Sequence, residues 1–433
     1  MIKPELLAPA GTLQNLRFAF AYGADAVYAG LPRYSLRVRN NDFDLANLAT
    51  GIAEAHGLGR RLYLAANVVP HDAKVKTFLC DMEPMVALGP DALIMADPGL
   101  ILLVRERWPE LPVHLSVQAN TMNAASVRFW ARQGIRRVIL SRELGLDEVA
   151  AIREQCPDVE LEVFVHGALC IAYSGRCLLS GYFNHRDPNQ GACTNACRWD
   201  YKVHPAGEDV SGDVVLHRHA AAQGTYLLEE GTRPGQLMPV EEDEHGTYIL
   251  NSRDLRAVEH VARLAAIGVD SLKIEGRTKS HYYVARTAQI YRQAIDDACA
   301  GRPFDPRLAT ALEGLANRGY TSGFYQRHAP QDYQSYHSGR SESDVQRFVG
   351  EVVAYDALSG LAEIDVKNKF AVGDRLELIH PEGARTLRVE RMEDLAGNAL
   401  AEAPGGGWRV RIPLPALDHR YSLLARHLAG EAA

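Results

Sequence analysis

The sequence predicts an α/β fold, a (β/α)8 TIM-type barrel with a small C-terminal antiparallel β-barrel domain. Short β-rich runs alternate with periodic apolar segments that are typical of helices. Gly-containing triplets stand where a helix would end just before the next strand; they begin at Gly23, Gly89, Gly134 and Gly268. The first strand is followed by Ala8-Pro9-Ala10-Gly11, which lacks the Gly-rich phosphate turn expected of an open doubly wound sheet.

Eight strands are expected in the barrel, with helices between most of them. The strands are expected at Pro4–Leu7, Ala26–Ala29, Arg61–Val68, Ala92–Ala96, Val113–Val117, Arg137–Leu140, Leu161–Val165 and Ser271–Ile274. The periodicity predicts helices at Leu13–Tyr22, Val75–Leu88, Ser126–Gln133, Leu255–Ile267, Tyr282–Ala300 and Arg307–Arg318. In such a barrel, catalytic and binding residues lie where the strands end and the following loops begin.

The barrel domain is expected to span 1–330. Its pattern breaks at 202–244, a stretch without periodicity that predicts an insertion or a lid. The polar run 331–345 predicts a linker, and 346–428 then alternates like short antiparallel strands. These are expected at Val349–Tyr355, Leu361–Val366, Arg375–Ile379, Thr386–Met392 and Trp408–Ile412.

Composition limits the function classes. The 433 residues are 47% apolar and 23% charged, which is typical of a globular protein with more than one domain. A net charge of −7 is unlike the basic footprint of a general nucleic-acid binder, so any RNA contact must come from a local basic face. The sequence offers neither an apolar run long enough for a membrane span nor an export signal. We therefore expect a cytoplasmic protein.

Four of the seven cysteines are crowded into one window with the spacing C-x6-C-x15-C-x3-C; they are Cys170, Cys177, Cys193 and Cys197. In a reducing cytosol such clusters are more often metal ligands or reactive thiols than disulfides. Structural zinc prefers close cysteine pairs, and only the last two cysteines approach that spacing. An iron–sulfur cluster takes four thiolates at irregular spacing. The spacing alone leaves iron–sulfur, zinc and redox thiols open. The other three, Cys80, Cys156 and Cys299, are expected to be buried apolar side chains.

Polar side chains follow the ends of several predicted strands. His166, Lys273 and Glu275 are candidate acid–base groups, although a buried histidine and a Lys273–Glu275 ion pair are the structural alternatives. Gln118 and Asn120 would share one face of a strand. Arginine forks suit carboxylates and phosphates, although each arginine could instead form a surface ion pair. The candidate substrate-binding residues are Arg37, Arg39, Gln118, Asn120, Arg142 and Arg277.

Several segments, including LAPAGTLQNLRFAFAYGADAVYAG, RYSLRVRNNDF, HGALC, SGRCLLSGY, TNACRWDY and SLKIEGRTKS, resemble the collagenase-like peptidase family, peptidase family U32. The resemblance runs from about Glu5 to about Leu424. It implies a 4Fe-4S cluster on Cys170, Cys177, Cys193 and Cys197.

The same resemblance implies a tRNA-modifying enzyme that converts the wobble uridine of the anticodon loop to 5-hydroxyuridine. Prephenate is the implied co-substrate, and the electron donor is left unidentified. Hydroxylation of ribosomal RNA or ubiquinone, a peptidase, and a non-catalytic iron–sulfur scaffold are the alternatives. The sequence contains neither H-E-x-x-H nor G-x-S-x-G, which gives the peptidase little support.

Overall fold

The computed structural model describes residues 3–30, 33–35, 42–169, 253–317, 319–326, 343 and 345–428. It also describes the backbone of six short strands, paired as three antiparallel hairpins, within the interval 206–247. These are β8 (Ala206–Glu208), β9 (Val214–Leu216), β10 (Tyr226–Glu229), β11 (Leu237–Val240), β12 (Glu242–Asp243) and β13 (Gly246–Thr247). The rest of the expected insertion at 202–244 lies outside the described residues, as does most of the expected linker at 331–345.

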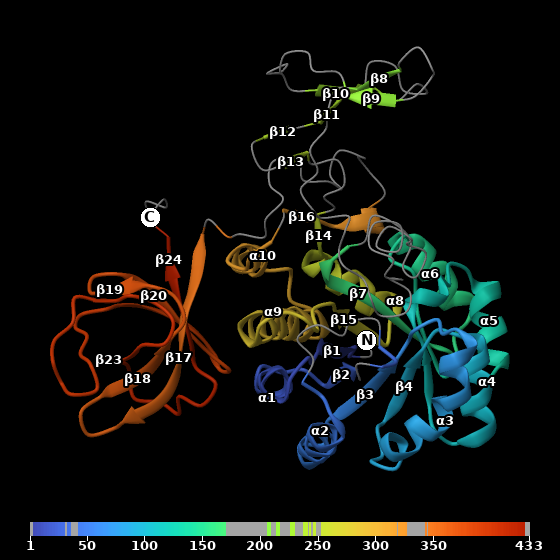
Figure 1. Ribbon diagram of the computed structural model, residues 1–433, viewed down its shortest axis with the longest axis horizontal. Coiled ribbons are helices and arrows are strands. Elements are labelled where there is room, and N and C mark those ends of the chain that lie inside the picture. The colour runs from blue at the N-terminus through green and yellow to red at the C-terminus, as the bar shows by residue number, and fades with distance from the viewer. Residues whose placement is uncertain are drawn as a thin grey trace.

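Eight parallel strands close into the predicted barrel (Figure 1). Its last strand hydrogen-bonds both to the first and to the seventh, which leaves the barrel without an open edge. The strands are β1 (Glu5–Pro9), β2 (Ala26–Gly30), β3 (Arg61–Ala66), β4 (Ala92–Met95), β5 (Val113–Leu115), β6 (Arg137–Ile139), β7 (Glu160–Ala168) and β15 (Ser271–Ile274). The prediction of the barrel is confirmed.

Helices return the chain between the strands. They are α1 (Leu13–Ala21), α2 (Leu45–Gly57), α3 (Asp72–Val86), α4 (Pro98–Arg107), α5 (Ala124–Arg132), α6 (Leu146–Gln155), α8 (Val261–Ile267), α9 (His281–Cys299) and α10 (Pro306–Glu313). Polar side chains such as Thr12, Asp97 and Ser280 accept a backbone N–H in the first turn of their helices. The four predicted cap glycines all have left-handed φ angles, between 75° and 96°.

Two predicted helices differ from the structure. The segment expected as a helix at Leu255–Ile267 begins as strand β14 (Asp254–Arg256), followed by a short 3₁₀ turn and α8. The reason is tertiary: β14 pairs antiparallel with the end of β7, Asp254 opposite Ala168, and β16 (Tyr320–Thr321) pairs with β14. The helix expected at Arg307–Arg318 ends at Glu313.

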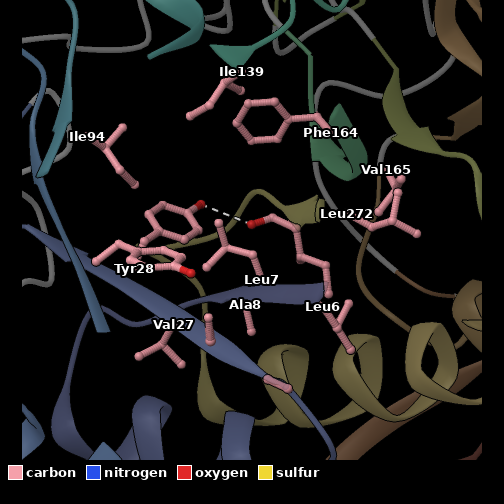
Figure 2. Packing of buried hydrophobic residues seen from close by; sticks show 14 of the residues in the cluster. Leu6, Leu7, Ala8, Val27, Tyr28, Ile94, Ile139, Phe164, Val165 and Leu272 are labelled. Carbon is pink, nitrogen blue, oxygen red and sulfur yellow. Dashed lines mark hydrogen bonds between the residues drawn. The ribbon is translucent and has the colours of Figure 1, made fainter. Parts of the chain in front are cut away.

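Side chains from neighbouring strands fill the core (Figure 2). Leu6, Leu7 and Ala8 of β1 are fully buried, as are Val27 of β2 and Leu272 of β15. Burying a leucine or valine side chain contributes roughly 1.5–3 kcal/mol relative to leaving it exposed. Among the cysteines outside the window, Cys156 is buried and Cys299 is half-buried. Cys80 is exposed on α3, so the expectation that it would be buried is wrong.

The C-terminal domain is an antiparallel sheet in the order β21-β20-β24-β17-β18-β23. Its strands are β17 (Gln346–Asp356), β18 (Leu361–Val366), β20 (Arg375–His380), β21 (Gly383–Arg388), β23 (Arg409–Pro413) and β24 (Leu423–His427); β19 (Phe370–Ala371) and β22 (Glu402–Ala403) pair separately. The sequence did not indicate β24, and the strand expected at Thr386–Met392 begins and ends earlier. Glu393, after β21, bridges to Arg411 in β23, which brings the two edges of the sheet together.

This domain packs against α9 and α1 (Figure 1). Arg286 of α9 makes two hydrogen bonds to the Glu377 carboxylate, at 2.9 and 3.1 Å, and both side chains are largely buried. The Tyr22 hydroxyl, just after α1, donates to two backbone carbonyls of the C-terminal domain. These contacts fix the domain to the barrel. No helix in the part of the chain that the structure describes is long and apolar enough to cross a membrane.

Candidate functional site

A ladder of ion pairs fills the interior of the barrel at the end where the strands begin, which we call its lower end. Arg137 of β6 contacts three carboxylates, at 2.6 Å from Glu5, 2.8 Å from Glu160 and 3.2 Å from Glu162. Glu162 is fully buried and also accepts a 2.9 Å hydrogen bond from Lys273 of β15. Every charge in this ladder has an opposite partner, as burial in a low-dielectric interior requires. The ladder therefore has a structural role.

Lys273 and Glu275 do not form the ion pair considered from the sequence. β15 ends at Ile274, so the two side chains no longer follow one strand face. Lys273 points into the barrel onto Glu162, whereas Glu275 lies 3.2 Å from Arg142. Burial lowers the pKa of Lys273 below its ordinary value, and the adjacent Glu162 carboxylate opposes that shift.

Three cations and two aromatic rings form one row above the ladder. The Lys273 ammonium lies 4.3 Å from the centre of the Tyr28 ring, and Arg277 lies 5.6 Å from the same ring. The Arg142 guanidinium lies 3.8 Å from the centre of the Phe164 ring, and Lys273 is 5.4 Å from that ring. The faces of aromatic rings attract cations. This attraction helps to hold the three cationic side chains at the barrel mouth, the end of the barrel where the parallel strands end.

The two arginines of this row are also tied to the loops of the mouth. Arg142 donates to the Ala168 carbonyl at 2.8 Å and to Glu275 at 3.2 Å. Arg277 donates to the Ser35 hydroxyl in the loop after β2. Both guanidinium groups are largely buried. We call Arg142, Lys273, Glu275, Arg277, Tyr28 and Phe164 the mouth cluster, and its two guanidinium groups suit a carboxylate or a phosphate.

Gln118 and Asn120 do not share a strand face. β5 ends at Leu115, and the chain turns into a 3₁₀ helix, η1 (Val117–Ala119). Asn120 ends this turn with a left-handed φ of 52° and donates to the Gln118 carbonyl. The Gln118 side chain accepts a 3.1 Å hydrogen bond from Asn67 at the end of β3. The pair thus stabilises the loop, and its expected arrangement on one strand face is corrected.

His166 lies away from the mouth cluster. A register irregularity between Lys273 and Ile274 lets β7 turn this side chain outward against α9. Its ring is enclosed by Tyr283, Tyr291 and Tyr320, with ring centres 5.4–5.8 Å away. Burial lowers the pKa of His166 to about 3, and its Nε2 atom has no hydrogen-bond partner within the described ranges. A neutral, enclosed histidine is poorly placed for proton transfer at the mouth.

Two tyrosine hydroxyls hold the loop after β15, and the sequence did not indicate that they act together. The Tyr28 hydroxyl donates to the Ile274 carbonyl at 2.9 Å (Figure 2), and the Tyr283 hydroxyl donates to the Glu275 carbonyl at 2.8 Å. Glu162 and Phe164 were also missed. A charged residue such as Glu162 within an otherwise apolar strand is a signal that could have identified the ladder.

Several predicted site residues lie outside the described residues. They are Arg37, Arg39, Cys170, Cys177, Cys193 and Cys197. Cys170 follows directly after Leu169, the last described residue beyond β7. Within the described ranges, no group of three or more His, Cys, Asp or Glu side chains could hold a metal ion. The cysteine ligands therefore stay a prediction.

Comparisons with known proteins cover nearly the whole chain. The model of peptidase family U32 matches residues 11–335, and that of the peptidase family U32 C-terminal domain matches 344–426. A tRNA hydroxylation protein P from Escherichia coli is 59% identical over 100% of this chain and 98% of its own length. Its namesake from Haemophilus influenzae is 55% identical, over 99% and 97%. A solved structure of the U32 peptidase Mk0906 is 13% identical with a TM-score of 0.39, over 63% of this chain and 93% of that one.

Proposed function

We propose that this chain, which belongs to peptidase family U32, hydroxylates transfer RNA. One observation carries the proposal: the 59% identity, over the full chain, to a protein named for tRNA hydroxylation. The identity extends through both the barrel and the C-terminal sheet, so the chain has both parts of that relative. RNA recognition at a single-stranded loop is consistent with a protein of net negative charge, because unstacked bases there can be read by stacking and by hydrogen bonds to their edges.

The finer proposal is that the product is 5-hydroxyuridine at the wobble position of the anticodon loop, with prephenate as co-substrate. Prephenate carries two carboxylates. The mouth cluster supports this choice, because Arg142 and Arg277 place two guanidinium groups at one end of the barrel, with Lys273 between them. Bidentate guanidinium–carboxylate pairing would orient such an anion.

We further propose that Cys170, Cys177, Cys193 and Cys197 hold a 4Fe-4S cluster. The donor set fits, because such a cluster takes four thiolates and the chain supplies four in one window. The remaining cysteines are dispersed over α3, the end of α6 and α9. When bound, the cluster would supply one-electron redox chemistry.

Nucleoside analysis of tRNA tests the function. A strain that lacks the gene is complemented with the wild type or with Cys193→Ser, and its tRNA is digested and separated by liquid chromatography with mass spectrometry. We expect 5-hydroxyuridine and nucleosides derived from it to return only with the wild type. Purified protein with prephenate and unmodified tRNA gives the matching test in vitro. Full restoration by Cys193→Ser, or casein cleavage without any tRNA product, would contradict the proposal.

The cluster is tested separately by anaerobic purification. We expect about four irons and four sulfides per chain in the wild type, lost in Cys193→Ala and retained in Cys80→Ala. The exposed Cys80 on α3 is the matched control, because it removes a thiol outside the window. A colourless wild-type protein with one zinc would show that the metal assignment is wrong while leaving the tRNA assay to decide the function.

A further inference from the structure

We infer that Tyr283 is a positioning residue of the mouth cluster: from outside the barrel, it fixes the peptide that directs Glu275 and Arg277 over the mouth. This inference rests on the proposed function, because it names a determinant of the same anion site. The loop after β15, residues 275–277, is called the mouth loop. Tyr283 lies on α9 and not on a barrel strand, so its side chain contacts the mouth loop from the outer side of the barrel.

Two successive carbonyls of the mouth loop are held from opposite sides. Tyr28 of β2 donates to the Ile274 carbonyl from within the barrel, at 2.9 Å. Tyr283 donates to the Glu275 carbonyl from α9, at 2.8 Å. The Glu275 N–H donates in turn to the His166 carbonyl at 2.9 Å. With its peptide groups bonded on both sides, the loop has little freedom to rotate, and its side chains are directed accordingly.

The backbone makes room for the Tyr283 ring. A Cβ atom at Gly276 would lie 2.6 Å from Tyr283 Cε1, which is closer than any normal contact. At Gly167, on β7, a Cβ atom would lie 2.5 Å from the Glu275 carbonyl oxygen and 3.0 Å from the Tyr283 hydroxyl. Gly167 also has a φ of 106°, which a side chain rarely allows. One glycine on β7 and one in the loop after β15 thus leave room for this single hydrogen bond.

The side chains on either side of this peptide belong to the mouth cluster. Glu275 contacts Arg142 at 3.2 Å, and Arg277 donates to the Ser35 hydroxyl in the loop after β2. A shift of the Glu275–Gly276 peptide would therefore move one carboxylate and one guanidinium relative to Arg142. Binding of a small carboxylate anion depends on the spacing of these groups, because bidentate recognition tolerates little displacement.

Tyr282 provides a matched control on the same helix. It is adjacent to Tyr283, and both side chains are 6% exposed. Tyr282 stacks on Phe348 of the C-terminal domain, with ring centres 4.7 Å apart. Its hydroxyl has no hydrogen-bond partner in the part of the chain that the structure covers. Removing this hydroxyl changes the same chemical group on the same helix without affecting the mouth loop.

The experiment measures prephenate binding to full-length protein by isothermal titration calorimetry, for the wild type, Tyr283→Phe and Tyr282→Phe. We expect Tyr283→Phe to weaken binding about five- to tenfold, because the loop loses one hydrogen bond and a buried carbonyl loses its donor. Tyr282→Phe should stay within about twofold of the wild type. In the tRNA assay, the prephenate concentration at half-maximal rate should rise for Tyr283→Phe, with a smaller change in the maximal rate.

The outcomes separate the inference from the proposed function. If Tyr283→Phe lowers the melting temperature but binds prephenate as the wild type does, Tyr283 is only structural and the inference fails. If the wild type does not bind prephenate, the inference fails as well. If the wild type binds and Tyr283→Phe weakens binding, but no tRNA is hydroxylated, the inference stands and the proposed function fails. Should Tyr283→Phe not fold, Gly276→Ala gives the second test, because its Cβ atom would displace the Tyr283 ring, and unchanged prephenate binding there would overturn the inference.

Discussion

At the lower end of the barrel, Arg137 is surrounded by carboxylates: Glu5, Glu160 and Glu162 all lie within 3.2 Å of its guanidinium. At the mouth, Arg142 has one carboxylate, one backbone carbonyl and the face of an aromatic ring as its partners. The residue type and the burial are similar, but the electrostatic surroundings differ. An arginine whose charge is fully matched by carboxylates stabilises the fold, whereas one with a single carboxylate partner retains attraction for an added anion.

The largest loss of stability is expected on substitution of Glu162, which tests whether the lower end of the barrel is structural. Glu162→Ala removes the carboxylate shared by Arg137 and Lys273 and leaves buried charge uncompensated. We expect a loss of about 3–5 kcal/mol in the free energy of unfolding, measured by urea denaturation. Glu160→Ala is the control, because Glu160 is 29% exposed and should cost clearly less. Equal losses for the two variants would mean that the ladder is not the structural element inferred here.

Arg142 should show the opposite pattern. Arg142→Ala is expected to reduce prephenate binding and tRNA hydroxylation by roughly 10- to 100-fold, the range for losing a hydrogen bond to a charged group. Its unfolding free energy should change less than that of Glu162→Ala. Arg142→Lys keeps the charge but loses the planar fork, so partial activity is expected. A stability loss as large as that of Glu162→Ala, with unchanged prephenate binding, would mean that Arg142 stabilises the fold and does not bind the anion.

His166 sharpens the comparison through pH. Its pKa is lowered to about 3 in the folded protein but is about 6.5 in the unfolded chain, so only the unfolded chain binds a proton between these values. Its contribution to stability is complete above pH 6.5 and is lost as the pH falls toward 3. At pH 5.5 the loss from this residue is about 1.4 kcal/mol. Urea unfolding at pH 7.5 and 5.5 should show a smaller pH effect for His166→Phe than for the wild type. Identical pH effects on the two proteins would show that the pKa of His166 is not lowered by folding.

The sequence predicted the barrel because its strands are buried on both faces and its helices end at glycines. Val27, Leu64 and Ile94 belong to runs that neither face exposes to solvent, so composition alone marks the strand. The four cap glycines adopt the left-handed conformation that their position requires. β14 was missed because Asp254–Arg256 becomes a strand only by pairing with the end of β7, which local sequence does not encode.

The site was predictable only in part. Arg142 and Arg277 were expected at the mouth because polar residues at the ends of parallel strands converge at one end of a barrel, and the structure places both side chains there. The outward turn of His166 was not predictable, because it follows from a register irregularity between two strands distant in sequence. Tyr283 was also missed: it lies in a helix full of apolar and aromatic residues, where a tyrosine gives no sign of which carbonyl it meets.

The pairing of β14 with the end of β7 has a consequence for how the barrel tolerates change. Ala168 and Asp254 lie directly opposite each other, so the barrel itself holds together the two ends of the chain that runs between them. The entropy of closing that loop grows only logarithmically with its length, about 0.6 kcal/mol per doubling. The barrel can therefore carry this stretch as an exchangeable cassette. Replacing it with a tight turn should leave a foldable scaffold, onto which a different segment could be grafted at the same two residues.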